Sequence, residues 1–286
     1  MISKKKAAHK NSTVWTRLKK KPTAILAICC IVLFALAAIF ADVIAPYHYS
    51  EQDVSAMLQG PSAEHLLGTD DLGRDTLSRI IYGGRVSLSV GFIAIIIGLT
   101  VGGTLGAIAG FYRGRADNVI MRCMDIMQSI PATLLALVVA STLGPGMFNL
   151  MLAVGIATIP SYARVTRASV LTISNVEYIE AARLTGCGDA RIILTHIIPN
   201  CMATLIVNTT MRMAYAILSA ASLSFLGLGV KPPMPEWGAM MSSARQYITS
   251  DASMILYPGI AIVLVILSFN LLGDGLRDAM DPRLKN

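Results

Sequence analysis

The chain has 286 residues, of which 54% are hydrophobic and only 14% are charged, and its mean hydropathy is +0.62. Soluble domains usually carry about 25% charged residues, so this composition argues against a soluble globular protein. The net charge of +7 does not require a nucleic-acid partner. Eight of the 24 lysines and arginines lie before residue 22, beside an apolar run, where they can contact anionic lipid.

Six apolar stretches are long enough, or nearly long enough, to cross a bilayer as helices. The third carries Asp125 and Pro131 and the fourth is short, so these two fit the pattern less well than the others. We therefore expect an all-α membrane protein with six transmembrane helices. Their approximate ranges are 23–45, 86–110, 121–143, 147–162, 199–223 and 254–273.

The distribution of lysine and arginine predicts how these helices are oriented. With the basic tail 1–22 in the cytoplasm, six crossings also place the tail 276–286 there. Cytoplasmic segments then hold 18 of the 24 basic residues and outer segments hold five. The first apolar run is too long for a signal peptide and lacks a cleavage site, so we expect an uncleaved anchor. No cysteine falls in an outer segment, so we expect no disulfides.

The first helix and the outer segment after it cover residues 23–85. The outer part, 46–85, is long for an unstructured connection, so we expect local structure in it. Its residues 68–75 read G-T-D-D-L-G-R-D. The block that follows, 86–275, should hold the other five helices with short connections.

The second predicted helix carries glycines at a strict spacing of four residues: Gly98, Gly102, Gly106 and Gly110. Four residues advance a helix by about 400°, so these glycines form a stripe on one face. Such a stripe allows another helix to approach backbone to backbone. It predicts a packing seam, either within this subunit or against a second subunit.

The segment 174–199 is a charged, helix-forming stretch between two apolar runs, on the cytoplasmic side of the predicted topology. Ser174 or Asn175 can cap a helix whose first turn contains Glu177. Gly186 ends that helix, and a second helical stretch then runs to Pro199, which suits the first position of the fifth span. From these residues alone, the segment is either an interfacial loop or a docking element for a partner.

Arg212 lies about 20 Å into the fifth predicted helix. A guanidinium at this depth is costly and should face protein or water. It can therefore line a translocation path, or it can be held by a structural partner, with Asn208 one turn away. An outer loop with three prolines follows this helix and ends in Pro235, Glu236 and Trp237. The prolines stiffen it, and tryptophan is common at the membrane interface.

The segment 174–199 resembles the E-A-A loop of ABC importer permeases. Five residues match that pattern at its spacing: Glu180, Ala181, Ala182, Gly186 and Pro199. Two depart from it, since His196 stands where the pattern has Ile and Ile198 where it has Leu. Residues 68–75 and 223–238 are similar to signatures of the C-type permease of peptide and nickel importers. The resemblance covers nearly the whole chain from the first helix onward.

The resemblance implies a type I ABC importer permease fold and a subunit that translocates short peptides across the cytoplasmic membrane of a prokaryote. It implies that Glu177 and the five matching residues contact an ATPase subunit. It also implies an outer gate or a contact with the binding protein at two outer stretches. Their candidate residues are Asp70, Arg74, Asp75, Pro235, Glu236 and Trp237. The implied partners are a second, homologous permease, two ATPase subunits and an extracytoplasmic substrate-binding protein.

The chain contains no G-x-x-x-x-G-K-S/T phosphate loop, no H-E-x-x-H and no G-x-S-x-G. We therefore expect no catalytic residue, no metal site and no cofactor in this chain, with ATP and magnesium held by partner subunits. One alternative is the same role in a nickel or metal-chelate importer. An ion-coupled secondary transporter should have acidic or broken helices near the midplane, where the sequence offers only Arg212. A membrane scaffold would not need the E-A-A spacing.

Overall fold

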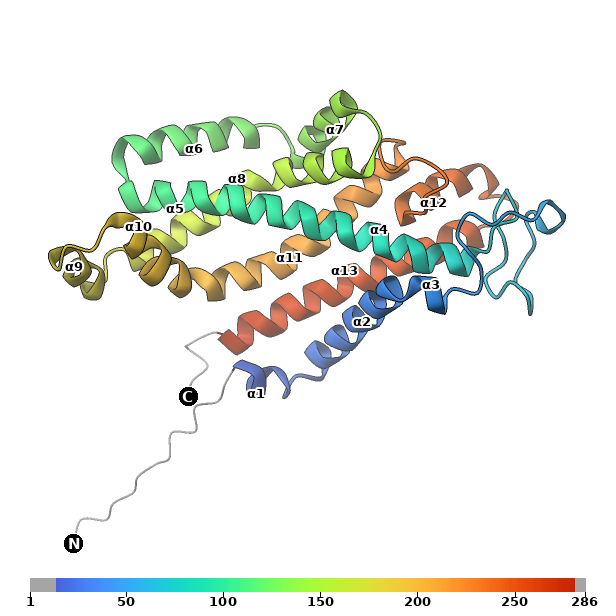
Figure 1. Cartoon of the computed structure of the whole chain (residues 1–286), viewed down its shortest axis with the longest axis horizontal. Helices are drawn as coiled ribbons and strands as arrows, with labels where there is room; N and C mark the ends of the chain where they lie inside the picture. Colours follow the sequence, from blue (N-terminus) through green and yellow to red (C-terminus); the bar gives the residue numbers. More distant parts are fainter. Residues whose placement is uncertain (1–13, 281–286) are drawn as a thin grey trace, which may run out of the picture.

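The computed structural model describes residues 14–280, and helices joined by turns make up this range, with no β-strand in it. The long helices lie roughly side by side (Figure 1). Helices α9 and α10 lie at one end, together with the start of α1 and the finish of α13. Helix α12 and the blue-green loops lie at the other end. Both described ends of the chain are therefore on the side of the segment 174–199.

The first predicted helix is confirmed as α2 (Pro22–Ile39), preceded by α1 (Val14–Leu18) and followed by α3 (Ala41–Ile44). The last is confirmed as α13 (Ser253–Met280). Short helices occupy the outer segments: η1 (Val54–Ala56), α12 (Trp237–Ala244) and η4 (Arg245–Tyr247). Most of the predicted cytoplasmic tails lies outside the described residues.

The second helix begins ten residues earlier than predicted. It is continuous from α4 (Thr76–Ile97) through the π-helical turn η2 (Gly98–Gly102) to α5 (Gly103–Tyr112). The expected outer segment 46–85 therefore ends at Asp75, whose carboxylate accepts a hydrogen bond from the backbone N–H of Ser78 and caps α4. The prediction failed because Arg79 and Arg85 appear too polar for a helix, whereas each is paired with an aspartate.

The third predicted helix is two helices, not one. α6 (Gly114–Gln128) and α7 (Ala132–Leu143) meet at an angle of 83°. Pro131 lies in the break, where it cannot donate a backbone hydrogen bond. Among residues 14–280, five helices are long and apolar enough to cross a membrane on their own, and the bent pair makes a sixth if it counts as one crossing.

The fourth helix, α8 (Met147–Ile173), is longer than the predicted range 147–162. Its C-terminal half carries arginines that the sequence pattern assigned to a loop. Arg164 pairs with Asp125 of α6 at 2.7 Å, and Arg167 pairs with Asp117 of α6 at 2.5 Å. These ion pairs allow the helix to continue with charged side chains, and they join α8 to α6.

The fifth helix also starts earlier than predicted. α10 (Asp189–Ile192), the π-helical turn η3 (Ile193–Ile197) and α11 (Ile198–Phe225) form one continuous helix of 37 residues. Pro199 is therefore not the first residue of the span. It is near the start of α11, directly after η3, and a π-helical turn is a usual way for a helix to accommodate an interrupted hydrogen-bond ladder.

The glycine stripe packs against α8 of the same subunit. A Cβ atom added at Gly102 would lie 2.9 Å from Tyr162 Cβ, and one at Gly106 would lie 2.9 Å from Thr166 Cβ. Each would lie even closer to a backbone carbonyl of α8. This confirms the first of the two seams that the spacing allows: α5 packs backbone to backbone against α8.

Candidate functional site: the coupling loop and the outer stretches

The segment 174–199 forms a short helix, a turn and the start of a long helix, as predicted. The short helix is α9 (Glu177–Leu184). The expected cap at Ser174 or Asn175 is wrong, because the residue before the helix is Val176 and no side chain caps it. The oxygens of Ser174 and Asn175 instead accept hydrogen bonds from Arg113, at 2.8 and 2.7 Å.

Gly186 ends α9 in the conformation for which glycine is suited. Its φ is +81°. The backbone N–H of Gly186 donates to the carbonyl of Arg183, and the N–H of Cys187 donates to the carbonyl of Ala182. These two bonds make a Schellman motif with glycine in its left-handed position. The motif fixes the angle at which the chain leaves α9 toward α10.

One face of α9 is anchored to the transmembrane helices. Ile179 is 1% exposed and packs in an apolar cluster with Phe111 of α5, Val170 of α8 and Ile192 of α10. The guanidinium of Arg183 lies 4.9 Å from the centre of the Phe111 ring, a favourable cation–π distance. A displacement of α9 must therefore be transmitted to helices α5, α8 and α10.

The opposite face of α9 is open to a partner. Glu177, Glu180, Ala181 and Gly186 are exposed, and Pro199 is exposed on α11. Ala182 alone among the matching residues is partly buried, because it packs against the same apolar cluster as Ile179. Leu184 is 86% exposed. A face with two carboxylates, small residues and one exposed leucine can bind another protein.

We name residues 174–199 the coupling loop. Sequence reasoning missed its attachment points, Arg113, Phe111 and Ile179. Ile179 is the one large aliphatic residue in the first turn of α9, between Tyr178 and Glu180. This pattern was a signal for a buried face. No local pattern indicated Arg113, because its partners lie 61 and 62 residues further along the chain.

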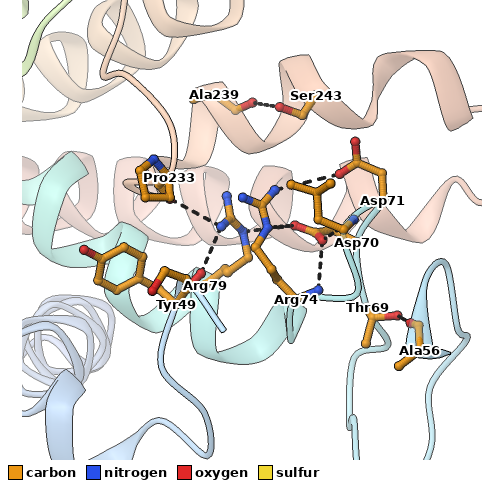
Figure 2. Close-up of polar contacts among 12 residues, drawn as sticks. Tyr49, Ala56, Thr69, Asp70, Asp71, Arg74, Arg79, Pro233, Ala239 and Ser243 are labelled. Carbon is orange, nitrogen blue, oxygen red and sulfur yellow. Dashed lines mark hydrogen bonds and ion pairs between the residues drawn. The ribbon is translucent and has the colours of Figure 1, made fainter. Parts of the chain in front are cut away.

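The two outer stretches, 68–75 and 223–238, meet through Arg79. Figure 2 shows Arg79 between Asp70 on one side and the loop at Pro233 on the other. Asp70 Oδ2 lies 2.7 Å from Nε of Arg74 and 3.3 Å from Nε of Arg79. A second nitrogen of Arg79 donates to the carbonyl of Tyr49 at 3.1 Å and lies 3.4 Å from that of Pro233. Both arginines are buried, so this network braces the outer loops.

Asp75, the last residue of the stretch 68–75, is held by a separate set of hydrogen bonds. Its Oδ2 accepts from the backbone and hydroxyl of Ser78, both at 2.7 Å, and its Oδ1 lies 3.0 Å from Nδ1 of His65. Asp75 and His65 are both buried. Asp75 therefore caps α4, and its contact with His65 holds the carboxylate in place.

Glu236 and Trp237 are buried rather than interfacial. The carboxylate of Glu236 caps α12 by accepting from the N–H of Ala239 at 2.9 Å, and it also accepts from the hydroxyl of Ser87 at 3.1 Å. Burial raises the pKa of Glu236, and hydrogen bonds to the carboxylate partly oppose this shift. Trp237 is 0% exposed and donates to the carbonyl of Ile80 at 3.0 Å.

The expected contact of the outer stretches with a binding protein does not fit these positions. In this conformation Arg74, Asp75, Pro235, Glu236 and Trp237 are buried, and Asp70 is partly buried. These residues lie beneath the outer loops and support them, and they are not on the exposed surface themselves. Their assignment to an outer gate remains a prediction.

Arg212 lies in α11 and is half-buried. It is remote from the coupling loop along the helix and does not belong to the outer network. Over residues 14–280, no group of three histidine, cysteine or acidic side chains is arranged to hold a metal ion.

Comparison with known families gives two matches. Residues 102–286 match the family described as binding-protein-dependent transport system inner membrane component. Residues 12–61 match the N-terminal transmembrane domain of oligopeptide transport permease C.

Three similar proteins are permeases. A dipeptide transport system permease protein from Alkalihalophilus pseudofirmus is 47% identical over 94% of this chain and 89% of its own. A di/tripeptide permease from Pseudomonas aeruginosa is 47% identical over 95% and 92%. A glutathione transport system permease from Pectobacterium atrosepticum is 43% identical over 95% and 91%.

Among solved structures, the inward-facing MetNI methionine ABC transporter is similar in fold. Its TM-score is 0.58 at 18% identity, over 71% of this chain and 97% of that chain. This similarity concerns the fold, and it agrees with the expected type I permease architecture.

Proposed function

This chain belongs to the family of binding-protein-dependent transport system inner membrane components, and we propose that it translocates short peptides. As a member of this family it is a multi-pass inner-membrane permease subunit of an ABC importer, which works with ATPase subunits. The observation that carries the proposed mechanism is the coupling loop, with one face open to a partner and the other anchored to three helices. The names of the relatives support peptides as the cargo.

The proposed mechanism converts movement of α9 into movement of the long helices. Closure of the ATPase pair, which holds ATP and magnesium, pushes on the exposed face around Glu180. Because Ile179 and Arg183 fix α9 to the helices below it, these helices move with it. The subunit alternates between inward-facing and outward-facing packings of similar energy. This chain supplies no catalytic group in the proposal, since hydrolysis occurs in the partners.

The proposed complex contains this chain, a second homologous permease, two ATPase subunits and an extracytoplasmic binding protein. The bracing of the outer loops by Arg79 supports a shaped outer surface on which a binding protein can be received. The residues available for such a contact are the exposed ones of the outer loops, among them Lys231, Pro232 and Met234.

Reconstitution tests the proposal directly. In proteoliposomes containing the whole complex and its binding protein, labelled dipeptide should accumulate only with ATP. Accumulation should be unaffected by ionophores that dissipate ion gradients, since no gradient is coupled to transport. Uptake that needs a gradient and not ATP would support the secondary-transporter alternative. Uptake of nickel but not of dipeptide would support the metal importer.

We propose further that both termini and the coupling loop are cytoplasmic, as the distribution of basic residues suggests. In a cysteine-free background, an impermeant thiol reagent added to intact cells should label Ser62→Cys but not Leu184→Cys. Both positions are exposed in this subunit, and the permease is expressed without the ATPase subunits that would cover Leu184, so accessibility to the reagent differs only by side of the membrane. Permeabilised cells should show labelling of both. Labelling of Leu184→Cys alone in intact cells would contradict the orientation.

A further inference from the structure

Arg212 differs from the arginines of α4 and α8 in having no carboxylate partner. The four arginines of those helices each pair with an aspartate: Arg79, Arg85, Arg164 and Arg167. Within the described part of the chain, no carboxylate lies within ion-pair distance of Arg212, and its guanidinium makes no hydrogen bond. Its electrostatic neighbour is the hydroxyl of Tyr162 on α8.

The depth of Arg212 makes an unpaired charge costly. It lies near the middle of α11, about 20 Å from either end of that helix. Ionisable side chains at such depth face the bundle interior or a water-filled cavity, and they mark substrate pathways or are paired. Arg212 is half-buried, and no acidic residue among residues 14–280 pairs with it, so its guanidinium is available to a group from outside this subunit.

The surroundings of Arg212 offer a second unsatisfied group. Asn208 lies one turn earlier, on the same face of α11 and about 6 Å along its axis. Its Oδ1 is buried and has no hydrogen-bond partner among the described residues. Next to it, Thr209 accepts a hydrogen bond from Tyr162 at 3.2 Å. We name Tyr162, Asn208, Thr209 and Arg212 the Arg212 cluster.

We propose that the Arg212 cluster binds the carboxyl end of the transported peptide during its passage. This inference rests on the proposed function and adds a specificity to it. The guanidinium fork of arginine matches a carboxylate in two hydrogen bonds. The last amide N–H of a peptide belongs to the same residue as its carboxylate. In the proposal, the helix movements of transport open the buried Asn208 Oδ1 to this N–H. An acidic side chain of a second permease would supply the carboxylate but no such N–H for Asn208.

The test compares a dipeptide with its carboxamide in the reconstituted complex. The probes are labelled alanyl-alanine and alanyl-alanine amide, and the variants are Arg212→Gln, Arg212→Lys and Asn208→Ala. Arg245→Gln is the control, because it removes an exposed arginine outside the long helices. For each probe, uptake by a variant is divided by uptake by the wild type. This ratio cancels any preference of the binding protein, which is the same in both assays.

Arg212→Gln should lower uptake of the free acid about tenfold, the effect of losing a charge-assisted hydrogen bond, and leave the ratio for the amide near one. Arg212→Lys should recover part of the loss. Asn208→Ala should lower both ratios modestly, since both probes carry the amide N–H. Arg245→Gln should not separate the two ratios, since a contact with the binding protein would affect both probes alike. Arg212→Gln should leave the abundance of the complex unchanged.

Equal loss of both probes with Arg212→Gln, together with lower abundance of the complex, would overturn the proposal and indicate a pair with an acidic residue of the second permease. Unchanged uptake of both would also overturn it. If the wild-type complex imports neither probe with ATP, the proposed function itself fails, which is a different result. The wild-type complex can also import the free acid but not the amide. In that case, a large loss of acid uptake with Arg212→Gln at normal abundance, partly recovered by Arg212→Lys, still supports the proposal.

Discussion

Gly106→Ala should destabilise the protein strongly, whereas Gly103→Ala, three residues earlier in the same helix, should not. A Cβ atom at Gly106 would meet Thr166 Cβ at 2.9 Å and would lie closer still to the backbone carbonyl of Ala163. Backbone cannot rotate away as a side chain can, so α5 must move off α8. Overpacking of this kind typically costs about 1–3 kcal/mol. At Gly103 the nearest atoms are 3.8 Å away, and alanine adds helix propensity.

The measurement is thermal unfolding of the two purified variants beside the wild type, with abundance in the membrane as a second reading. Gly106→Ala should melt several degrees lower, and Gly106→Leu should fail to accumulate. Gly103→Ala should melt at or slightly above the wild-type temperature. Equal melting of Gly103→Ala and Gly106→Ala would show that the stripe is not a seam within this subunit.

The glycine stripe illustrates what the sequence could provide. Spacing of four residues predicted a seam, because helix geometry places such residues on one face. It could not distinguish a seam within the subunit from one between subunits, because the contacting residues of α8 come about sixty residues later. The contact of Gly106 with Ala163 and Thr166 forms only in the folded structure.

The errors at the start of the second helix and at the end of the fourth share one physical cause. The pattern treated charged residues as marks of loops, yet Arg79, Arg164 and Arg167 lie within long helices because each is paired with an aspartate elsewhere in the chain. Hydropathy is a property of single residues, whereas neutralisation by an ion pair depends on tertiary structure. The break between α6 and α7 was indicated only by Pro131, whose presence does not determine the angle.

The coupling loop was predictable to a greater degree, since helix propensity and the glycine at its end are local properties. The span of α9 and the left-handed Gly186 agree with the sequence. The anchoring contacts of Ile179 and Arg183 do not follow from local pattern. The burial of Glu236 and Trp237 likewise depends on α4, which lies about 150 residues away in sequence.

Glu180→Lys and Gly186→Val should abolish uptake while leaving the protein in the membrane. Glu180 is exposed on α9, so reversing its charge changes the surface offered to the ATPase subunit and leaves the buried face of the loop intact. Gly186 has φ +81° and nothing within 4 Å of an added Cβ atom. Its substitution therefore acts through backbone strain alone, at a cost of about 1–2 kcal/mol or more for a β-branched residue. That strain redirects the end of α9.

Gly188→Val is the matched control for this last prediction. Gly188 also has nothing within 4 Å of an added Cβ atom, but its φ is −68°, which valine adopts readily. Gly188→Val should retain most of its uptake and its association with the ATPase subunit, measured by copurification. Gly186→Val should lose both at equal abundance. If Glu180→Lys and Gly186→Val both kept wild-type uptake and association, the coupling loop would have no role in energy transfer. If Gly188→Val lost as much uptake and association as Gly186→Val, the cause would be the added bulk of valine. The geometry of the Schellman turn would then not be the cause.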